Sequence, residues 1–172
     1  MLVTVEHSFA MPALHPRTQA YDSEHIVARK DAKPLLILHV EDDENDAILF
    51  QKACERAGLP VQTFHVAAAD EAKSYLRGEG KYADRVRYPF PQIIVLDLKM
   101  PRLDGFEFLK WLRQTESFAA LPALVFTASV SREDKSRAIA EGANSYFVKP
   151  ASFEALVKMV EGFGVHDQGR WN

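Results

Sequence analysis

The sequence predicts an α/β domain with a doubly wound parallel sheet. Short apolar segments recur along the chain, and segments with helical periodicity separate them. Continuous apolar runs are typical of parallel strands that are covered on both faces by helices. Strands that alternate with helices five times imply right-handed crossover connections, and so a (βα)5 arrangement. No internal repeat or low-complexity segment competes with this interpretation.

Five apolar segments are expected to form the strands. They are Leu35–Val40, Val61–Val66, Gln92–Leu96, Ala123–Thr127 and Ser145–Val148. The connection from Gly78 to Pro91 is the longest one and is rich in glycine, proline and charge. We therefore expect it to be a surface loop that is available to partners.

The helices are predicted from periodicity and from end signals. Asp46–Ala57 is expected to be the first helix, because its apolar residues share one face and Gly58 follows. Ser131 followed by Asp134 resembles a capping box that begins a fourth helix, and Gly142 is its expected end. The third helix and the last helix carry apolar stripes that are more simply core than a cofactor site. These stripes are Phe106, Phe108, Trp111 and Leu112, and Phe153, Leu156, Val157 and Val160.

The bulk properties of the chain limit the domain count and the location. Its 172 residues suffice for one well-cored domain, which we expect at 34–163, with a flexible N-terminal extension at 1–33 and a short tail at 164–172. The net charge of -3 gives no basic excess, so no nucleic-acid partner is expected. A single cysteine, Cys54, cannot form an internal disulfide, and no segment has the length of a membrane helix. A cytoplasmic protein without a membrane partner is the expectation.

Acidic residues follow two of the predicted strands. Glu41–Asp46 contains five acids in six residues directly after the first strand, and Asp97 ends the third strand. Each acidic group, taken alone, could simply be a solvated turn or a helix cap. In a flavodoxin-like sheet of order 2-1-3-4-5, strands 1 and 3 are neighbours and ligands bind at their carboxyl ends. Glu41, Asp42 and Asp97 would then converge, and three such carboxylates require protons or a cation; their hard oxygens favour Mg²⁺.

The pattern as a whole resembles the response-regulator receiver family of two-component signalling. The resemblance covers about residues 34–162, and its marks occur in the expected order, each at an expected strand end. They are Glu41-Asp42, Asp97, the segment Met100–Gly105, Thr127-Ala128 and Lys149-Pro150.

The resemblance implies a role for each residue of the site. Asp97 would accept a phosphoryl group from a histidine kinase. Asp42 and Asp97 would ligate Mg²⁺ directly, Glu41 would act through a bound water, and the main-chain carbonyl of Lys99 would be a further ligand. The Lys99 side chain departs from the polar, uncharged residue that relatives often have there, and it could reach Asp97 or its phosphoryl group.

The resemblance also implies a switch. The Thr127 hydroxyl would donate to a phosphoryl oxygen, and the Lys149 ammonium would pair with Asp97 before transfer and with the phosphoryl group afterwards. Tyr146 would change rotamer when Thr127 moves, which gives the two states that a signal requires. A cis peptide bond before Pro150 is a further implication.

The output and the partners are expected from a narrower resemblance. The acidic block, the long loop before the third strand and the residues around Asp97 look most like stand-alone regulators that are paired with bacterial phytochrome-type kinases. This implies a signal passed to an unknown downstream protein through helix 4, strand 5 and helix 5, and often a homodimer through the same surface. Phe147 and Phe153 offer apolar material for it, although a core uses the same residue types.

Two other functions share parts of this pattern, and two histidines lie within the predicted strands. A Mg²⁺-dependent phosphohydrolase of the haloacid-dehalogenase type usually has a second aspartate where this chain has Lys99, so we expect no enzyme. A receiver-like interaction module that is never phosphorylated is the other alternative, and the retained Asp97 and Lys149 argue against it. His39 and His65 lie inside apolar strands and are expected to be structural residues with satisfied hydrogen bonds.

Overall fold

A computed structural model describes residues 33–100 and 104–164, and these residues form a doubly wound α/β domain. Its elements are β1 (Leu35–Val40), α1 (Glu44–Arg56), β2 (Val61–Val66), α2 (Ala69–Arg77), the 3₁₀ helix η1 (Gly80–Ala83), β3 (Ile93–Leu96), α3 (Gly105–Gln114), β4 (Ala123–Thr127), α4 (Arg132–Ala140), β5 (Ser145–Val148) and α5 (Phe153–Gly164). The strands are all parallel and lie in the order β2-β1-β3-β4-β5, as predicted.

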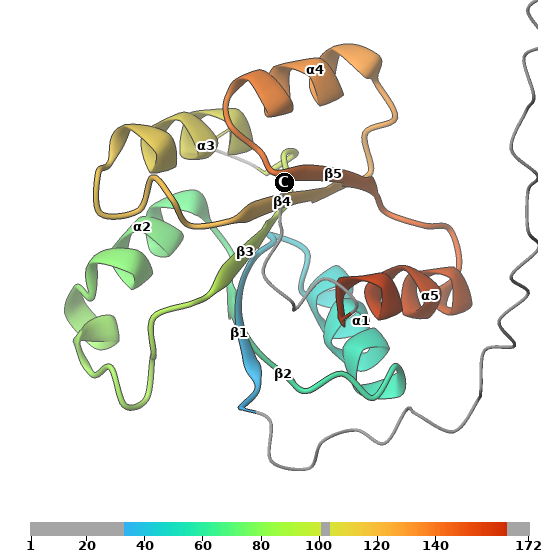
Figure 1. Ribbon diagram of the computed structural model, residues 1–172, viewed down its shortest axis with the longest axis horizontal. Helices are drawn as coiled ribbons and strands as arrows, with labels where there is room; N and C mark the ends of the chain where they lie inside the picture. The colour runs from blue at the N-terminus through green and yellow to red at the C-terminus, as the bar shows by residue number, and fades with distance from the viewer. Residues whose placement is uncertain (1–32, 101–103, 165–172) are drawn as a thin grey trace, which may run out of the picture. The chain divides into compact units, whose positions relative to one another are not determined.

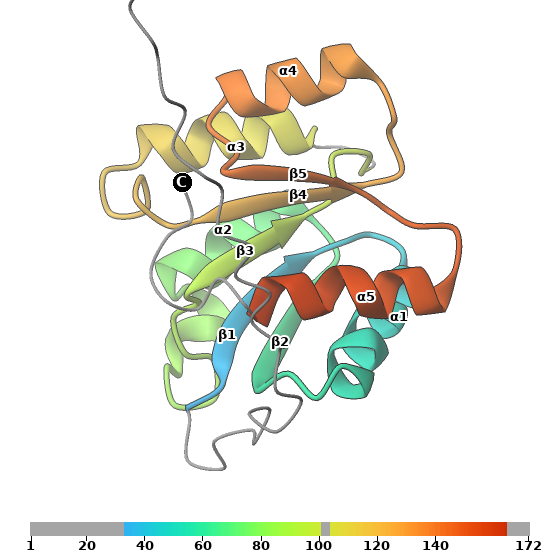
Figure 2. The same ribbon diagram turned by 45° about the vertical axis from the view of Figure 1, so that its right-hand side comes forward.

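Helices cover both faces of the sheet. Figures 1 and 2 show α1 and α5 on one face and α2, α3 and α4 on the other. Successive side chains of a strand point to opposite faces, so Leu38 and Val40 pack toward α2 and α3, whereas Ile37 packs toward α1 and α5. The sheet thus separates two apolar cores, one on each face.

The edge strands are less covered than the sequence suggested. β3 and β4 are buried at every position, as continuous apolar runs predict. β2 and β5 have the burial of edge strands, and Val148 is 41% exposed. The sheet as a whole is covered on both faces as predicted, and these two strands are less buried because each has a neighbouring strand on one side only.

The acidic turn after β1 begins α1 two residues earlier than predicted. The Asp43 carboxylate accepts hydrogen bonds from the main-chain N–H groups of Asn45 and Asp46, at 2.8 and 3.4 Å. Such a cap satisfies donors that the first turn of a helix leaves free, so the helix starts at Glu44. Part of the acidic block is thus a helix cap, which leaves Glu41 and Asp42 ahead of the helix.

The segment between α2 and β3 is anchored and contains η1, so the prediction of a plain surface loop is incomplete. Tyr82 is 5% exposed and packs against Tyr75 and Tyr88, with ring centroids 4.9 and 5.0 Å apart. The Arg85 guanidinium donates hydrogen bonds to the main-chain carbonyls of Tyr75 and Leu76. A run of glycine and charge predicts exposure, but these aromatic rings bury part of the loop.

Helix α4 begins at the predicted cap. The main-chain N–H of Asp134 donates to Ser131 Oγ at 3.2 Å, which confirms the forward half of the capping box. Gly142 has a φ of 97° just after the helix, a conformation that favours glycine. The predicted segments at 1–32 and 165–172 lie outside the described residues. Within the described part of the chain, no helix has the length and apolar character needed to cross a membrane.

Candidate functional site

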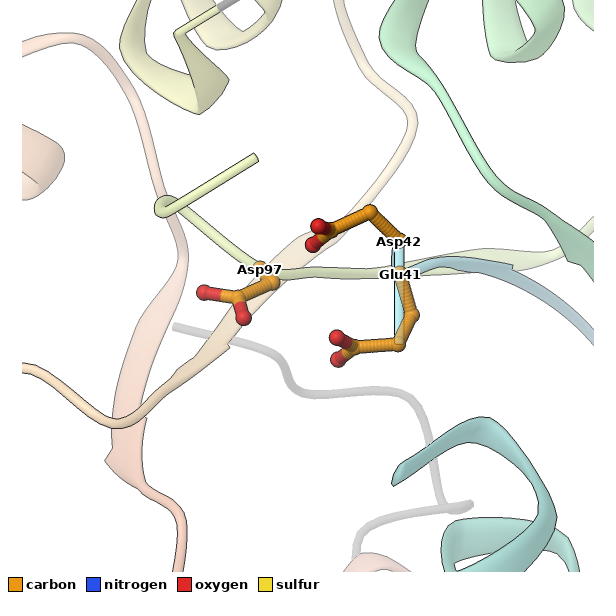
Figure 3. Close-up of side chains that lie close together, drawn as sticks. All are labelled: Glu41, Asp42 and Asp97. Carbon is orange, nitrogen blue, oxygen red and sulfur yellow. The ribbon is translucent and has the colours of Figure 1, made fainter. Parts of the chain in front are cut away.

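Three carboxylates converge at the carboxyl ends of β1 and β3. Val40 pairs with Leu96 in the sheet, and the main-chain N–H of Asp97 donates to the Val40 carbonyl at 3.0 Å. Glu41 and Asp97 therefore leave neighbouring strands side by side, with Asp42 next to them (Figure 3). One carboxylate oxygen from each of the three lies within 4.8 Å of the others.

Lys149 joins these carboxylates from the end of β5. Its Nζ lies 2.7 Å from Glu41 Oε2, 2.8 Å from Asp97 Oδ2 and 2.7 Å from Asp46 Oδ2. The main-chain N–H of Lys149 donates to the Thr127 carbonyl at 2.8 Å, which fixes the residue beside β4. The contact with Asp46 was not predicted. The sequence feature that could have indicated it is the position of Asp46 in the first turn of α1, shortly after Glu41 and Asp42.

The electrostatics of the site separate the two buried acids. Burial alone would raise the pKa of Asp97, but the Lys149 ammonium, the Lys99 main-chain N–H and the Thr127 hydroxyl hold that pKa below its ordinary value. Burial dominates at Glu41 and raises its pKa to about 7, against the opposing effect of Lys149. Burial would lower the pKa of Lys149, yet its three carboxylate partners raise it. Near neutral pH, Asp97 is thus a carboxylate beside a cation.

The main chain around Asp97 is closely packed. The Lys99 N–H donates to Asp97 Oδ1 at 3.0 Å. Gly105, at the start of α3, is so near that an added Cβ would lie 2.7 Å from the Asp97 carbonyl oxygen and 2.8 Å from Leu98 Cα. Thr127 is fully buried at the end of β4. The main chain of Asp97 is therefore held in place by its neighbours, and its side chain extends toward the other carboxylates.

The donor atoms present fit a hard divalent cation. Glu41 Oε2 is buried and lies 2.7 Å from Lys149 Nζ, so this oxygen already faces a cation. Asp42 is exposed, which gives the cluster a side open to solvent. Oxygen donors with access to water are the ligands that Mg²⁺ and Mn²⁺ prefer. The described residues offer no cluster of cysteine and histidine that would suit a softer metal.

Tyr146 and Pro150 lie on either side of Lys149. The Tyr146 hydroxyl donates to the Ser129 carbonyl at 2.9 Å, and the half-buried ring packs against the core. The described residues contain no cis peptide bond, so the implication of a cis bond before Pro150 is wrong for this structure. Proline makes the difference between the two isomers small, about 0.5–1 kcal/mol in favour of trans, so motif resemblance does not fix the isomer.

Lys99 turns away from Asp97. Its Nζ lies 3.1 Å from Asp134 Oδ2 on α4, and its side chain is 60% exposed. The Ser129 hydroxyl donates to the same Asp134 oxygen at 2.5 Å. The sequence places a lysine at this position but does not give the direction of its side chain, because the partner of Lys99, Asp134, lies 35 residues further along the chain.

The two strand histidines differ from each other, and within the described part of the chain only His65 shows the hydrogen bond that was predicted. His39 is buried against Phe50, and its Nε2 has no hydrogen-bond partner among the described residues; Glu41 Oε2 is 3.9 Å away. Burial lowers the pKa of His39 to about 3, so the ring is neutral. The expectation of satisfied hydrogen bonds is therefore wrong for His39 Nε2, because the Glu41 carboxylate oxygen near it lies beyond hydrogen-bond distance. His65 Nε2 lies 2.7 Å from the Glu41 carbonyl oxygen.

A doubly wound sheet of this order, with acids after β1 and β3 and a lysine after β5, defines the receiver class of signalling domains. The family model described as the response regulator receiver domain matches residues 37–161. The chain therefore belongs to the response regulator receiver family. None of the relatives described below is a haloacid-dehalogenase hydrolase, and the family is one of signalling proteins.

Three relatives illustrate this membership. The probable methanogenesis regulatory protein FilR2 of Methanothrix harundinacea is 35% identical over 88% of this chain and 93% of its own length. Response regulator Rcp1 of Synechocystis is 30% identical over 75% of this chain and 86% of its own length. The solved structure of the phosphorylated cyanobacterial phytochrome response regulator RcpA is 29% identical, covers 79% of this chain and 97% of its own, and superposes with a TM-score of 0.71. The chain is thus a response regulator homologous to phytochrome response regulators.

Proposed function

We propose that Asp97 accepts a phosphoryl group from a phosphohistidine of a sensor histidine kinase and that the phosphorylated protein is the signal. The observation that supports this most directly is the contact of a buried aspartate at a strand end with a lysine, 2.8 Å away, inside a cluster of acids. The Lys149 ammonium and the Lys99 and Thr127 donors keep Asp97 ionised against the effect of burial, and a nucleophile requires this ionised form. Phosphorylation of the relative RcpA, stated in the name of its structure, supports the same chemistry.

We further propose that Glu41, Asp42, Asp97 and the main-chain carbonyl of Lys99 hold Mg²⁺. The convergence of the three carboxylates supports the site, and so does the solved Mn²⁺-bound form of Rcp1, which is 28% identical with a TM-score of 0.68 and covers 77% of this chain and 94% of its own. The bound cation would neutralise charge on the transferring group, so that an anionic nucleophile can approach it.

The transfer exchanges one bond to phosphorus for another. An oxygen of the Asp97 carboxylate attacks the phosphorus, the P–N bond of the phosphohistidine breaks, and the P–O bond of an acyl phosphate forms. The kinase histidine leaves as a neutral imidazole when its free nitrogen takes a proton from solvent. Lys149 stays within reach of the new charge, and Thr127 can turn its hydroxyl toward a phosphoryl oxygen.

We propose that the signal leaves through Tyr146 and the surface of α4, β5 and α5. Tyr146 is tied to the Ser129 carbonyl, two residues after Thr127, so movement of Thr127 would disturb this hydrogen bond. On the same surface Ile139 and Val148 are 47% and 41% exposed, which offers apolar area to a downstream protein or to a second copy of the chain.

For the partner, we propose a phytochrome-type sensor kinase in the cytoplasm. The similarity to Rcp1 and RcpA supports it. FilR2, with a higher identity, is named for methanogenesis, so similarity at this level extends across signalling pathways. Transfer from a phosphorylated phytochrome-type kinase, compared with an unrelated histidine kinase at equal concentration, tests the choice. Equal or faster labelling by the unrelated kinase would contradict it.

The phosphoacceptor itself is tested with Mg²⁺ and a small phosphodonor, by intact mass. Wild type should gain one phosphoryl group, and Asp97→Asn should gain none. Equal labelling of both proteins would refute Asp97 as the acceptor. No adduct from small donors or from candidate kinases would instead favour an interaction module that is never phosphorylated.

A further inference from the structure

Helix α4 is tied to the segment after β3 by two ion pairs, with little apolar contact of its own. Among its nine residues only Ala138 is buried. Lys99 Nζ lies 3.1 Å from Asp134 Oδ2, and Arg137 Nη1 lies 3.5 Å from Asp104 Oδ2. All four charged side chains line one surface pocket. Ion pairs at exposed sites are weak and readily exchange partners, so a new charge nearby can release this attachment.

The Lys99–Asp134 pair lies in a series of contacts from the acceptor to the aromatic residue of β5, which passes along the side chain of Lys99 and through Ser129. The Lys99 N–H donates to Asp97 Oδ1, and its ammonium contacts Asp134. Asp134 also accepts a hydrogen bond from the Ser129 hydroxyl, and the Ser129 carbonyl accepts one from Tyr146. Lys99 therefore contacts Asp97 through its main chain and Asp134 through its ammonium, and so connects the site to the α4–β5 surface.

We propose that Asp134 holds Lys99 in the unphosphorylated protein and that the phosphoryl group on Asp97 takes Lys99 from it. The assignment depends on phosphorylation of Asp97, as proposed above. A phosphoryl group carries nearly two negative charges, whereas Asp134 carries one. Lys99 is two residues from Asp97 and 60% exposed, so its side chain is free to turn. Its departure leaves Asp134 without its cation, which loosens the start of α4 and, through the hydrogen bond from Ser129 to Asp134, the segment that anchors Tyr146.

Because Asp134 and the phosphoryl group would compete for Lys99, the direction in which each substitution changes the affinity for a phosphoryl mimic can be stated. Whatever the Lys99–Asp134 pair contributes to the resting state opposes the phosphorylated state by the same amount. Asp134→Asn removes the competing charge but keeps the main-chain N–H that Ser131 caps. Exposed ion pairs are worth a factor of about two to five in an equilibrium constant. Asp134→Asn should therefore strengthen binding of a phosphoryl mimic about two- to five-fold.

Beryllofluoride, which binds an aspartate carboxylate as a phosphoryl mimic, makes this an equilibrium measurement. Its affinity in the presence of Mg²⁺ is measured from amide chemical shifts for wild type, D134N, K99Q and the double variant. The gain from D134N should appear with Lys99 present and vanish in the K99Q background. Arg137→Gln is the control for loosening of α4, because it removes the other ion pair and the contact of Arg137 with the Phe106 ring without freeing Lys99, and its affinity should not exceed that of wild type.

The outcomes separate the coupling from the proposed function. A D134N gain that persists in the K99Q background would mean that Asp134 acts through α4 alone, which overturns the proposal, and so would an unchanged or weakened affinity of D134N. A gain from R137Q as large as that from D134N would likewise show general loosening of the helix. If wild type binds no beryllofluoride and gains no phosphate adduct, the phosphoacceptor function itself fails.

Discussion

The ammonium of Lys149 lies among three carboxylates, and its replacement by methionine removes the charge while keeping most of the side-chain length. Its distances to Glu41, Asp46 and Asp97 are 2.7, 2.7 and 2.8 Å. Glu41 and Asp97 are 0% and 5% exposed, so water compensates them poorly. In Lys149→Met, two buried anions would face each other without the cation that now lies between them.

The size of the effect follows from the ways in which these anions can be compensated. Removing one partner of a buried ion pair costs about 3–5 kcal/mol when the other charge stays unpaired. Glu41 has a pKa of about 7, so near neutral pH it can take up a proton for less than about 1 kcal/mol. We therefore expect K149M to lose about 2–3 kcal/mol of unfolding free energy in a chelator at neutral pH.

Magnesium should reverse much of this loss, because a divalent cation between the same carboxylates supplies the missing charge. A ligand at a hundred times its Kd stabilises a folded protein by about 2.7 kcal/mol, and Mg²⁺ should bind the variant more tightly than wild type, where Lys149 repels it. Urea unfolding followed by circular dichroism, with chelator and with excess Mg²⁺, measures the gap between the two proteins. Lys52→Met, on the exposed face of α1, is the matched control for the charge change. A K149M protein within about 0.5 kcal/mol of wild type in chelator, or a gap that Mg²⁺ leaves unchanged, would refute the reasoning.

Three further predictions concern other parts of the domain. The folded pKa of Glu41, about 7, lies above its unfolded value of 4.5, so its stabilising effect is present at low pH and lost as the pH rises through 7. In chelator, the unfolding free energy of wild type relative to E41Q should rise by about 0.8 kcal/mol from about pH 8 to about pH 6.5, as urea titrations would show, and a constant difference would contradict this. Burial raises the pKa of the Cys54 thiol to about 12, so alkylation followed by mass spectrometry should label it in the unfolded protein only, and rapid labelling of the native protein would argue otherwise. Gly105→Ala should cost about 1–3 kcal/mol and weaken Mg²⁺ binding measured by calorimetry, because the new methyl would meet the main chain of Asp97 and Leu98; unchanged stability would count against this packing.

The sequence was sufficient for the sheet and for the convergence of Glu41, Asp42 and Asp97. Both depend on strand periodicity and on parallel topology, which places the carboxyl ends of neighbouring strands together. The C-terminal end of α1 and both ends of α4 also followed from local chemistry, since a cap or a glycine acts on residues close in sequence. These features are predictable because each is decided within a few residues or by strand order alone.

The contacts that the sequence left open join residues distant along the chain. Arg113 is an example: its guanidinium donates to the carbonyls of Gly142, Ala119 and Leu121 and so fixes the turns around β4, although nothing local distinguishes it from a surface arginine. The direction of Lys99 toward Asp134 is another case. Such pairings depend on which helices face each other and at what depth, and periodicity does not contain that information.

The span of the Lys149 contacts along the chain has a consequence for synthesis and quality control. Lys149 and Asp46 are 103 residues apart, and Lys149 and Asp97 are 52 apart, so the site joins the first, third and fifth strands of the sheet. Contacts of such high sequence separation form only when the sheet between them is complete. A nascent chain, or one that has lost its last strand, therefore lacks the arrangement that we propose takes up a phosphoryl group. If that proposal holds, only molecules that have finished folding can signal, and incomplete molecules stay silent.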